Sequence, residues 1–553
     1  MREEYREWLF RHRISILIFA VIIGFFFRIY NLNYVGFAED EVNKINAVEK
    51  YLKGDFTPNA EHPMLMKNLI LVSVVVSRYY NENIAPKLNV RKIPIEVAVR
   101  FPNVLFGALT AICIYLLAFS FFDIEVALLS ALLWATGINA IMINRIAKED
   151  TLMVFFILLG FYFHRRFKTA KPEFKRKFYY LSAASFGAML SAKYFPHYLG
   201  LNFLFYAIHR KINPSEYIDD HYTFKDLVKY FVVFSLVFFA LNPMILSPEV
   251  LKYIIFYTHE GTMVHHGYYM LNHLYFNDVS RTPFNGTPWY FYLLYIFVKF
   301  PTIILIALIV GLVFCVKDWR KGGNFLILFL LFFWLVPYSL FGVKFCRYTL
   351  SLLPPIYMAA AIGVVKIFEA VKNYVDEGFL NLQRVKISFV IPILYVILPL
   401  SSLIVSNPFY SLYVNFIGGG KKNIGYFFPH DEFYDLDLRE AIRRTVEIAP
   451  TGSVIAGETP AVFEFYLKKF HREDMKVVEL SDKNGVVEEN RIVFVILQPG
   501  RMYFENLPFY RHLWGKKNPV VTVKVMGKDA INIYKISGEE YMKYASEREF
   551  PGD

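Results

Sequence analysis

Long apolar segments recur along this chain and limit what it can fold into. Most of them approach the ~20 residues that an α-helix needs to cross a bilayer. We count eleven, at about 14–30, 97–121, 124–143, 150–164, 179–195, 196–208, 230–246, 290–316, 325–341, 348–368 and 387–405. The sequence therefore predicts an all-α polytopic membrane protein with about 11 transmembrane helices. Segment 196–208 is short enough to be re-entrant or to merge with its neighbour.

The composition excludes an ordinary soluble enzyme. Of the 553 residues, 56% are hydrophobic and 18% are aromatic, and 56 are phenylalanine. Such a composition suits helices that are surrounded by lipid. The three cysteines, Cys113, Cys315 and Cys346, lie in or beside predicted spans and indicate no disulfide framework.

The net charge of +12 is distributed as a topology signal and not as a nucleic-acid footprint. Lysine and arginine gather at 2–13, 165–177, 209–211, 317–321 and 366–386. With eleven spans and a cytoplasmic start, all of these segments fall on one side, as the positive-inside rule requires. We therefore expect a multi-pass plasma (inner) membrane protein with a cytoplasmic N-terminus, an extracytoplasmic C-terminal domain and no nucleic-acid partner.

The extracytoplasmic side receives two loops, at 31–96 and 247–289, and the carboxyl-terminal residues 406–553. In the first loop, apolar residues recur at helical spacing from Asp40 to Leu52, which predicts an amphipathic helix along the membrane surface. A second apolar stretch follows at 65–76. Residues 1–405 are thus expected to form a transmembrane domain, with the two loops on its extracytoplasmic face.

Residues 406–553 differ in character from the rest of the chain. Strand-like runs at 453–456, 491–497, 520–525 and 530–536 are interspersed with helix-like segments at 437–447 and 460–469. The turn at 526–529 favours a hairpin between the last two strands. This pattern predicts a small α/β domain outside the membrane.

Charged and polar side chains gather on the extracytoplasmic face of the predicted bundle, where a bilayer would otherwise exclude them. They are Asp40, Glu41, His62, Lys67, Arg100, Arg145, Asp150, Lys193, His265, His266, Lys344 and Arg347. Each has an ordinary explanation: the acidic pair caps a helix, Arg145 and Asp150 form a local salt bridge, Lys193 snorkels, and Arg347 anchors the interface. Taken together, they place carboxylates and histidines opposite several cations.

That combination suits an anionic, phosphate-bearing lipid whose sugar is attacked at the water boundary. Cations hold the phosphate and stabilise it as a leaving group, while a carboxylate takes the proton from the attacking hydroxyl. The one cofactor that the sequence leaves open is a divalent metal ion. Its weak candidate ligands are Asp40, Asp150 and His265, because the histidines around 265–273 match no strict ligand spacing.

Seven motifs make the chain resemble a known family. They lie at 37–42, 61–67, 99–102, 144–150, 191–194, 287–290 and 347–354. In this order they resemble the motifs of the GT-C type, polyprenyl-phosphate-sugar-dependent glycosyltransferases, a family that includes protein O-mannosyltransferases and aminoarabinose (lipid A) transferases. The likeness covers about residues 10–420, and Met64 stands where the family has a second proline.

The resemblance implies an integral membrane, inverting glycosyltransferase. Residues 1–405 would be its catalytic domain, and the outer loops 31–96 and 247–289 would form its active site. The enzyme would move a single sugar, a mannose-like hexose or an aminopentose, from a polyprenyl-phosphate donor to a hydroxyl or phosphate acceptor on a protein, lipid or glycan. Carried onto this sequence, the resemblance makes Asp40 the candidate base, with Glu41 and Asp150 completing the catalytic set. The candidates for binding the donor phosphate or substrate are Lys67, Arg100, Arg145, Lys193, Arg347, His62, His265 and His266.

Two other classes of function compete with a glycosyltransferase. A transporter or flippase of lipid-linked sugars predicts charges deep inside spans and related halves, and the sequence has no visible repeat. A binding or scaffold protein would leave the charged cluster without a purpose. For the α/β domain, we expect a position over the site and a part in choosing the acceptor.

Overall fold

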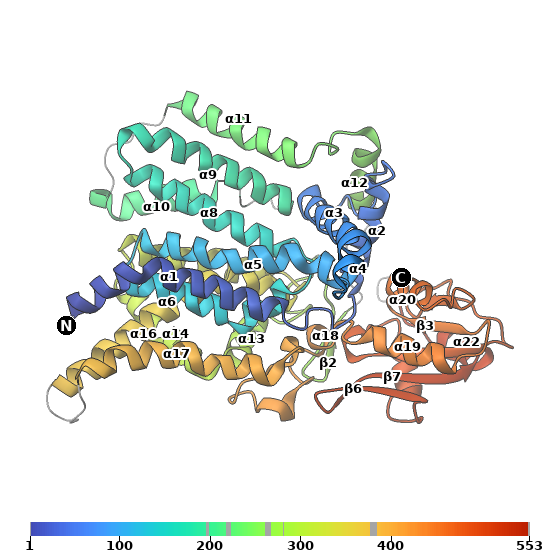
Figure 1. Ribbon diagram of the computed structural model, residues 1–553. Helices are drawn as coiled ribbons and strands as arrows, with labels where there is room; N and C mark the ends of the chain where they lie inside the picture. The colour runs from blue at the N-terminus through green and yellow to red at the C-terminus, as the bar shows by residue number, and fades with distance from the viewer. Residues whose placement is uncertain are drawn as a thin grey trace.

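A bundle of long helices makes up most of the molecule, and a five-stranded sheet lies at one end of it (Figure 1). The computed structural model describes residues 2–194, 198, 200–216, 223–259, 267–279, 281–376 and 384–550. The bundle helices are α1 (Arg2–Ile29), α5 (Ile95–Phe119), α6 (Ile124–Thr136), α7 (Ile138–Asn144), α8 (Asp150–Thr169), α9 (Pro172–Ala192), α10 (Leu201–Ile212), α11 (Phe224–Leu241), α13 (Phe291–Lys299), α14 (Thr302–Lys317), α15 (Gly322–Leu340), α16 (Leu353–Asp376) and α17 (Arg384–Ser406).

Where the structure describes them, the predicted apolar segments are mostly helical, but two of them are broken. Segment 290–316 was expected as one span, and it forms α13 and α14 instead. Phe300 leaves the helical region at φ −92° and ψ 142°, because the residue before a proline is pushed towards extended backbone and Pro301 follows. Segment 124–143 bends by 54° between α6 and α7.

Among the described residues, four helices are long and apolar enough to cross a bilayer, or five if α6 and α7 form one bent span. The four are α1 from Glu4, α5, α15 and α16 up to Tyr374. Shorter apolar helices cover Thr302–Lys317 (α14) and the part of α17 from Val390 to Ser406. The total of about 11 spans therefore stays a prediction.

Tight packing joins α14 to α16. A Cβ atom on Gly311 would lie 1.8 Å from the carbonyl oxygen of Ala359, and one on Gly363 would lie 1.8 Å from that of Ala307. Small residues spaced four apart on both helices thus allow the backbones to touch, as is common in membrane helix pairs.

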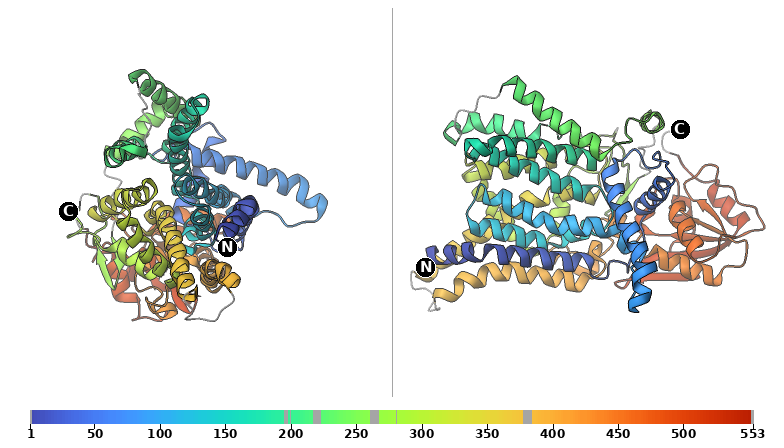
Figure 2. Two further views of the ribbon diagram at one scale, coloured as in Figure 1. Left: turned by 90° about the vertical axis from the view of Figure 1, so that its left-hand side faces the viewer. Right: turned by 45° about the horizontal axis from the view of Figure 1, so that its top comes forward.

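The first long loop forms α2 (Glu39–Tyr51), α3 (Met64–Tyr79) and α4 (Ala85–Leu88). The helix predicted from Asp40 is confirmed as α2, which buries Val42, Ile45 and Val48 and packs against α3 and α20 (Pro460–Lys469). The segment from α3 to α4 projects sideways from the bundle (Figure 2). Helix α12 (Pro248–His259) and a short hairpin of β1 (Tyr268–Met270) and β2 (His273–Tyr275) belong to the second loop.

The sheet at the end of the bundle has the strand order β4-β3-β5-β7-β6. Its strands are β3 (Val454–Gly457), β4 (Lys476–Glu479), β5 (Ile492–Leu497), β6 (Val521–Val525) and β7 (Lys528–Ser537), so the predicted strands and hairpin are found within about three residues. Strand β3 pairs in parallel with β4 and β5, and β7 pairs antiparallel with β5 and β6.

Helices cover both faces of this sheet. Val493, Val495 and Leu497 of β5 pack into a core with α21 (Leu507–Leu513) and α22 (Gly538–Ala545). The alternate residues Phe494 and Ile496 face the larger core, which includes α19 (Leu438–Ile448) and α20. Both faces of β5 are therefore buried, which explains its uninterrupted apolar sequence.

Candidate functional site

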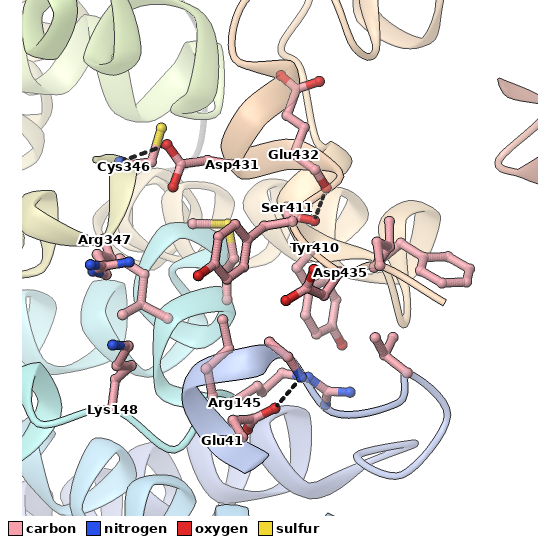
Figure 3. A pocket seen from close by; sticks show the side chains of 18 of the residues that line it. Glu41, Arg145, Lys148, Cys346, Arg347, Tyr410, Ser411, Asp431, Glu432 and Asp435 are labelled. Carbon is pink, nitrogen blue, oxygen red and sulfur yellow. Dashed lines mark hydrogen bonds between the residues drawn. The ribbon is translucent and has the colours of Figure 1, made fainter. Parts of the chain in front are cut away.

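The end of the bundle nearest the sheet contains a pocket with about 1160 Å³ of empty space, measured out to its open mouth. Its walls come from distant parts of the chain: the start of α2, the turn between α7 and α8, the segment before α16, and residues 408–436 after α17. In Figure 3, Asp431, Arg347 and Lys148 follow one another along one side of the pocket. This pocket is the candidate active site.

Asp40 contacts several cations in this pocket. Its carboxylate Oδ2 lies 2.6 Å from Nζ of Lys148 and 3.8 Å from Nη1 of Arg347. Nζ of Lys44 donates to the backbone oxygen of Asp40 at 3.3 Å. Asp40 stands in the first turn of α2, where the helix dipole also favours negative charge. One quarter of its side chain is exposed, so the carboxylate remains open to the pocket.

The charges around Asp40 shift the titration of this cluster. Burial alone would raise the pKa of the Asp40 carboxyl, but the positive charges of Lys148, Arg347 and Lys44 outweigh it and hold the pKa well below its usual value. Burial lowers the pKa of Lys148 to about 8, and Arg347 and Lys44 add to this effect while Asp40 opposes it. Asp40 is therefore ionised at neutral pH. A bound anion such as a phosphate would further stabilise the charged forms of the cations around it.

Glu41 lies in the wall of the same pocket, but its carboxylate is occupied. Oε1 accepts from Nε of Arg100 at 2.8 Å and from the N–H of Ala147 at 2.9 Å, while Oε2 lies 2.6 Å from Nη2 of Arg100. Arg100 gives its remaining donors to the carbonyls of Leu32, Val35 and Gly36. The pair thus fixes the chain that leads into α2, and all five donors of Arg100 are in use.

Arg145 and Asp150 do not form the local salt bridge considered from the sequence. Arg145 instead donates to four carbonyl oxygens at the end of α1, those of residues 27, 28, 30 and 31, at 2.7 to 3.1 Å. Asp150 pairs with Nζ of Lys193 at 2.7 Å, and both side chains are largely buried. Lys193 therefore binds a carboxylate and does not simply extend towards the interface. Neither Asp150 nor Lys193 lines the pocket.

His62 and Lys67 also lie outside the pocket lining. The ammonium of Lys67 donates to the carbonyls of Asn59 and His62, so it stabilises the turn before α3. Burial lowers the pKa of Lys67 to about 7 and that of His62 to about 4. Two predicted substrate residues, His265 and His266, lie outside the described residues.

Comparison with known proteins bears on the fold. The family model for dolichyl-phosphate-mannose-protein mannosyltransferase matches residues 94–241. The apo crystal structure of ArnT from Cupriavidus metallidurans is similar over 95% of this chain and 98% of that one, at a TM-score of 0.51 and 11% identity. This chain has the GT-C glycosyltransferase fold.

A second solved GT-C structure agrees. It is the crystal structure of the Archaeoglobus fulgidus oligosaccharyltransferase tethered with an acceptor peptide containing the NVT sequon. The match covers 89% of this chain and 70% of that one, at a TM-score of 0.50 and 12% identity. A comparison with curated protein sequences gave no match. The predicted resemblance to GT-C glycosyltransferases is confirmed in the fold, and the apolar helices support a multi-pass membrane protein.

Sequence reasoning about this GT-C pocket missed Lys148, Lys299 and Asp431. Lys148 lies inside the motif at 144–150, between Arg145 and Asp150. Lys299 is an ionisable residue within a predicted span, a signal in its own right, and its Nζ lies 2.6 Å from Oε1 of Glu432. Asp431 accepts from Tyr268 and, at 3.0 Å, from the N–H of Cys346. Nothing in the spacing around Asp431 indicated its place.

A metal ion finds no ready ligand set in the described part of the chain. No group of three or more His, Cys, Asp or Glu side chains there is placed to hold one. The weak candidates Asp40 and Asp150 are each paired with a lysine, and the third, His265, lies outside the described residues. The described donors thus do not fit a metal centre built from several protein ligands.

Proposed function

We propose that this chain moves a single sugar from a polyprenyl-phosphate donor to an acceptor hydroxyl or phosphate, with inversion at the anomeric carbon. The observation that carries this proposal is the open pocket in which one carboxylate, Asp40, lies beside Lys148 and Arg347. A base and a phosphate site are then within reach of one bound sugar. The description of the matching family model, which names a dolichyl-phosphate mannose, supports a polyprenyl-linked donor.

The proposed reaction is a direct displacement. For a hydroxyl acceptor, the oxygen attacks the anomeric carbon from the side opposite the phosphate, and its proton passes to the Asp40 carboxylate. The bond between the anomeric carbon and the phosphate oxygen breaks, and polyprenyl phosphate leaves with the electron pair. Lys148 and Arg347 offset the charge that develops on the departing oxygen.

Binding of the donor would also prepare the base. The positive charges of Lys148 and Arg347 lower the pKa of the Asp40 carboxyl. A phosphate that shares these two cations weakens their hold on the carboxylate, so Asp40 becomes more basic when the donor is in place. Because this route uses the chain's own cations, we propose that transfer needs no metal ion.

The surroundings of the reaction are proposed on the same basis. The ends of the bundle helices that carry the basic clusters lie away from the sheet (Figure 1), which supports a cytoplasmic N-terminus and an active site on the extracytoplasmic face of the plasma (inner) membrane. The donor is a mannose-like hexose or an aminopentose on its lipid, and the acceptor is a protein, lipid or glycan. We propose that the five-stranded sheet and the carboxyl-terminal residues around it (406–550, the sheet unit) help to select that acceptor.

Release of free polyprenyl phosphate tests the proposal. Purified wild type and Asp40→Asn would be given a panel of polyprenyl-phosphate sugars, with membrane extract as the source of acceptors and with or without EDTA. Release by the wild type alone, unchanged by EDTA, is expected. Loss of a general base typically costs about 10²- to 10⁴-fold in rate.

Other outcomes of this assay contradict parts of the proposal. Equal release by both proteins would remove Asp40 from the reaction. Loss of release in EDTA, restored by a divalent ion, would show that a metal takes part. Binding of every donor without any release would instead favour a transporter of lipid-linked sugars.

A further inference from the structure

The first residue of the acidic triplet, Glu39, faces away from the cations that surround Asp40. Its carboxylate lies 3.0 Å from Nη2 of Arg501, and its backbone N–H donates to Oδ2 of Asp435 at 2.9 Å. Arg501 follows strand β5 of the sheet, in a turn of 3-10 helix (Pro499–Arg501), and Asp435 lies just before α19. The amino end of α2 is thus bound by residues more than 390 positions away in the chain.

Asp435 and Arg501 form a two-pronged ion pair. Nε of Arg501 donates to Oδ1 of Asp435 at 2.9 Å, and Nη2 lies 2.5 Å from Oδ2. The Asp435 side chain is fully buried and that of Arg501 is 6% exposed. Gln498 adds a further donor to Asp435 at 3.2 Å, and the guanidinium stacks over Tyr434 at 4.1 Å. Such fork-like pairs fix geometry as well as charge.

Other residues of the sheet unit hold the segment that leads into α2. The hydroxyl of Tyr466 accepts from the N–H of Phe37 at 2.8 Å. Arg439 donates to the carbonyls of Asn33 and Tyr34 at 3.0 and 2.6 Å. The backbone from residue 33 to residue 39 is therefore bound at several points by the carboxyl-terminal part of the chain.

We propose that Asp435 and Arg501 are positioning residues that orient the first turn of α2 so that Asp40 faces Lys148 and Arg347. The sheet unit is then required for transfer itself, beyond any part in choosing the acceptor. This inference rests on the proposed role of Asp40 as the base. Figure 3 places Asp435 in the pocket wall, across from Arg347 in that view.

Helix geometry explains how the pair acts at a distance of one residue. At 3.6 residues per turn, neighbouring side chains point about 100° apart. Fixing Glu39 towards Arg501 therefore fixes the direction in which Asp40 points. Small displacements of a reacting group, of the order of 1 Å, cost about 10²-fold in rate, so a loosened helix start is enough to impair transfer.

The test compares Arg501→Gln, Asp435→Asn and the milder Glu39→Gln with wild type and with Arg443→Gln as a matched control. Arg443 lies on α19 of the same unit, is partly exposed and, within the described residues, forms its ion pairs with Glu440 and Glu447 of that helix. Three readouts are needed: kcat for transfer, affinity for polyprenyl phosphate, and the dependence of kcat/KM on pH.

For Arg501→Gln and Asp435→Asn we expect kcat to fall at least tenfold, while affinity for polyprenyl phosphate stays within twofold, because the phosphate cations are not on α2. The alkaline limit of kcat/KM should move to lower pH, since Lys148 loses the neighbouring charge of Asp40. Glu39→Gln, which keeps the buried pair, should lose a few-fold in kcat. The double variant Arg501→Gln with Asp435→Asn should be no worse than either single one.

Contrary results are distinct. Retention of wild-type kcat in Glu39→Gln and in either pair variant would overturn the inference. A fall in kcat that matches the loss of folded, phosphate-binding protein would also overturn it, because Asp435 and Arg501 would then stabilise the fold without positioning Asp40. If instead Asp40→Asn transfers as fast as wild type, the proposed function fails first, and the positioning role fails with it.

Discussion

At the scale of single residues, Lys148 is where pH should act on the reaction. Its pKa is lowered by burial to about 8, and an amine is charged only below its pKa. The contribution of Lys148 to binding the donor phosphate is therefore present below about pH 8 and is lost as the pH rises through that value, while Arg347 stays charged. We expect kcat/KM for the donor to fall across this range, whereas kcat, measured with bound phosphate, should fall only at higher pH.

The variant Lys148→Arg checks this assignment. Arginine stays charged throughout the accessible range, so the alkaline fall in kcat/KM should disappear even if its absolute value drops. Lys321→Gln is the control, because Lys321 is exposed and lines a surface hollow with Arg6, at the N-terminal end of the bundle. An unchanged alkaline limit in Lys148→Arg would assign that titration to another group.

Glu41 differs from its neighbour in what its removal should do. Glu41→Ala leaves the buried Arg100 without its carboxylate, and breaking a buried pair costs about 3–5 kcal/mol. We expect a large fall in thermal stability and in the yield of folded protein. Asp40→Asn should lower the unfolding temperature much less, because the Asp40 side chain is one-quarter exposed whereas that of Glu41 is fully buried. A Glu41→Ala protein that is stable but inactive would show that Glu41 acts in the reaction.

At the scale of helices and strands, the contact of α14 with α16 is the most sensitive to added volume. Gly363→Val places side-chain atoms against the Ala307 carbonyl, where even a Cβ would lie at 1.8 Å. The helices must separate, at a cost of about 1–3 kcal/mol or more. Thermal unfolding in detergent should fall accordingly, whereas Ile309→Ala on the outer face of α14 should change little. Equal stability of Gly363→Val and wild type would contradict the close packing.

At the scale of the whole molecule, the prediction concerns which side of the membrane the sheet faces. The three native cysteines are buried, so they give little background to thiol reagents. Glu488→Cys in the sheet unit should react with an impermeant maleimide in intact cells. Lys321→Cys at the opposite end should react only after permeabilisation. The reverse pattern would invert the proposed topology.

The sequence was sufficient for those features that depend on local periodicity. Apolar segments located the helices of the bundle, and short strand-like runs located β3, β5, β6 and β7, because each pattern reports burial within a short stretch. The motifs also located Asp40 and Arg347, which the structure places in one pocket. The break at Pro301 was readable in principle from the proline, but hydropathy averaged over the segment concealed it.

Pairing between distant residues was beyond the sequence. Lys67, Arg100, Arg145 and Lys193 all counted as candidates to bind the donor phosphate, yet each is engaged by carbonyls or a carboxylate of the chain. Lys148, the cation nearest to Asp40, was not among the predicted site residues. The sequence does not distinguish a charged side chain that binds a ligand from one that is hydrogen-bonded to the protein's own backbone.

The sequence by itself determined that the chain forms a helical membrane protein with an acidic motif at the start of α2, since hydrophobic length and local spacing are properties of short segments. Only the tertiary structure decided which carboxylate remains open and which cations surround it. That division depends on contacts between residues such as Asp40, Lys148, Arg347 and Arg501, which come together only when the bundle and the sheet pack on one another.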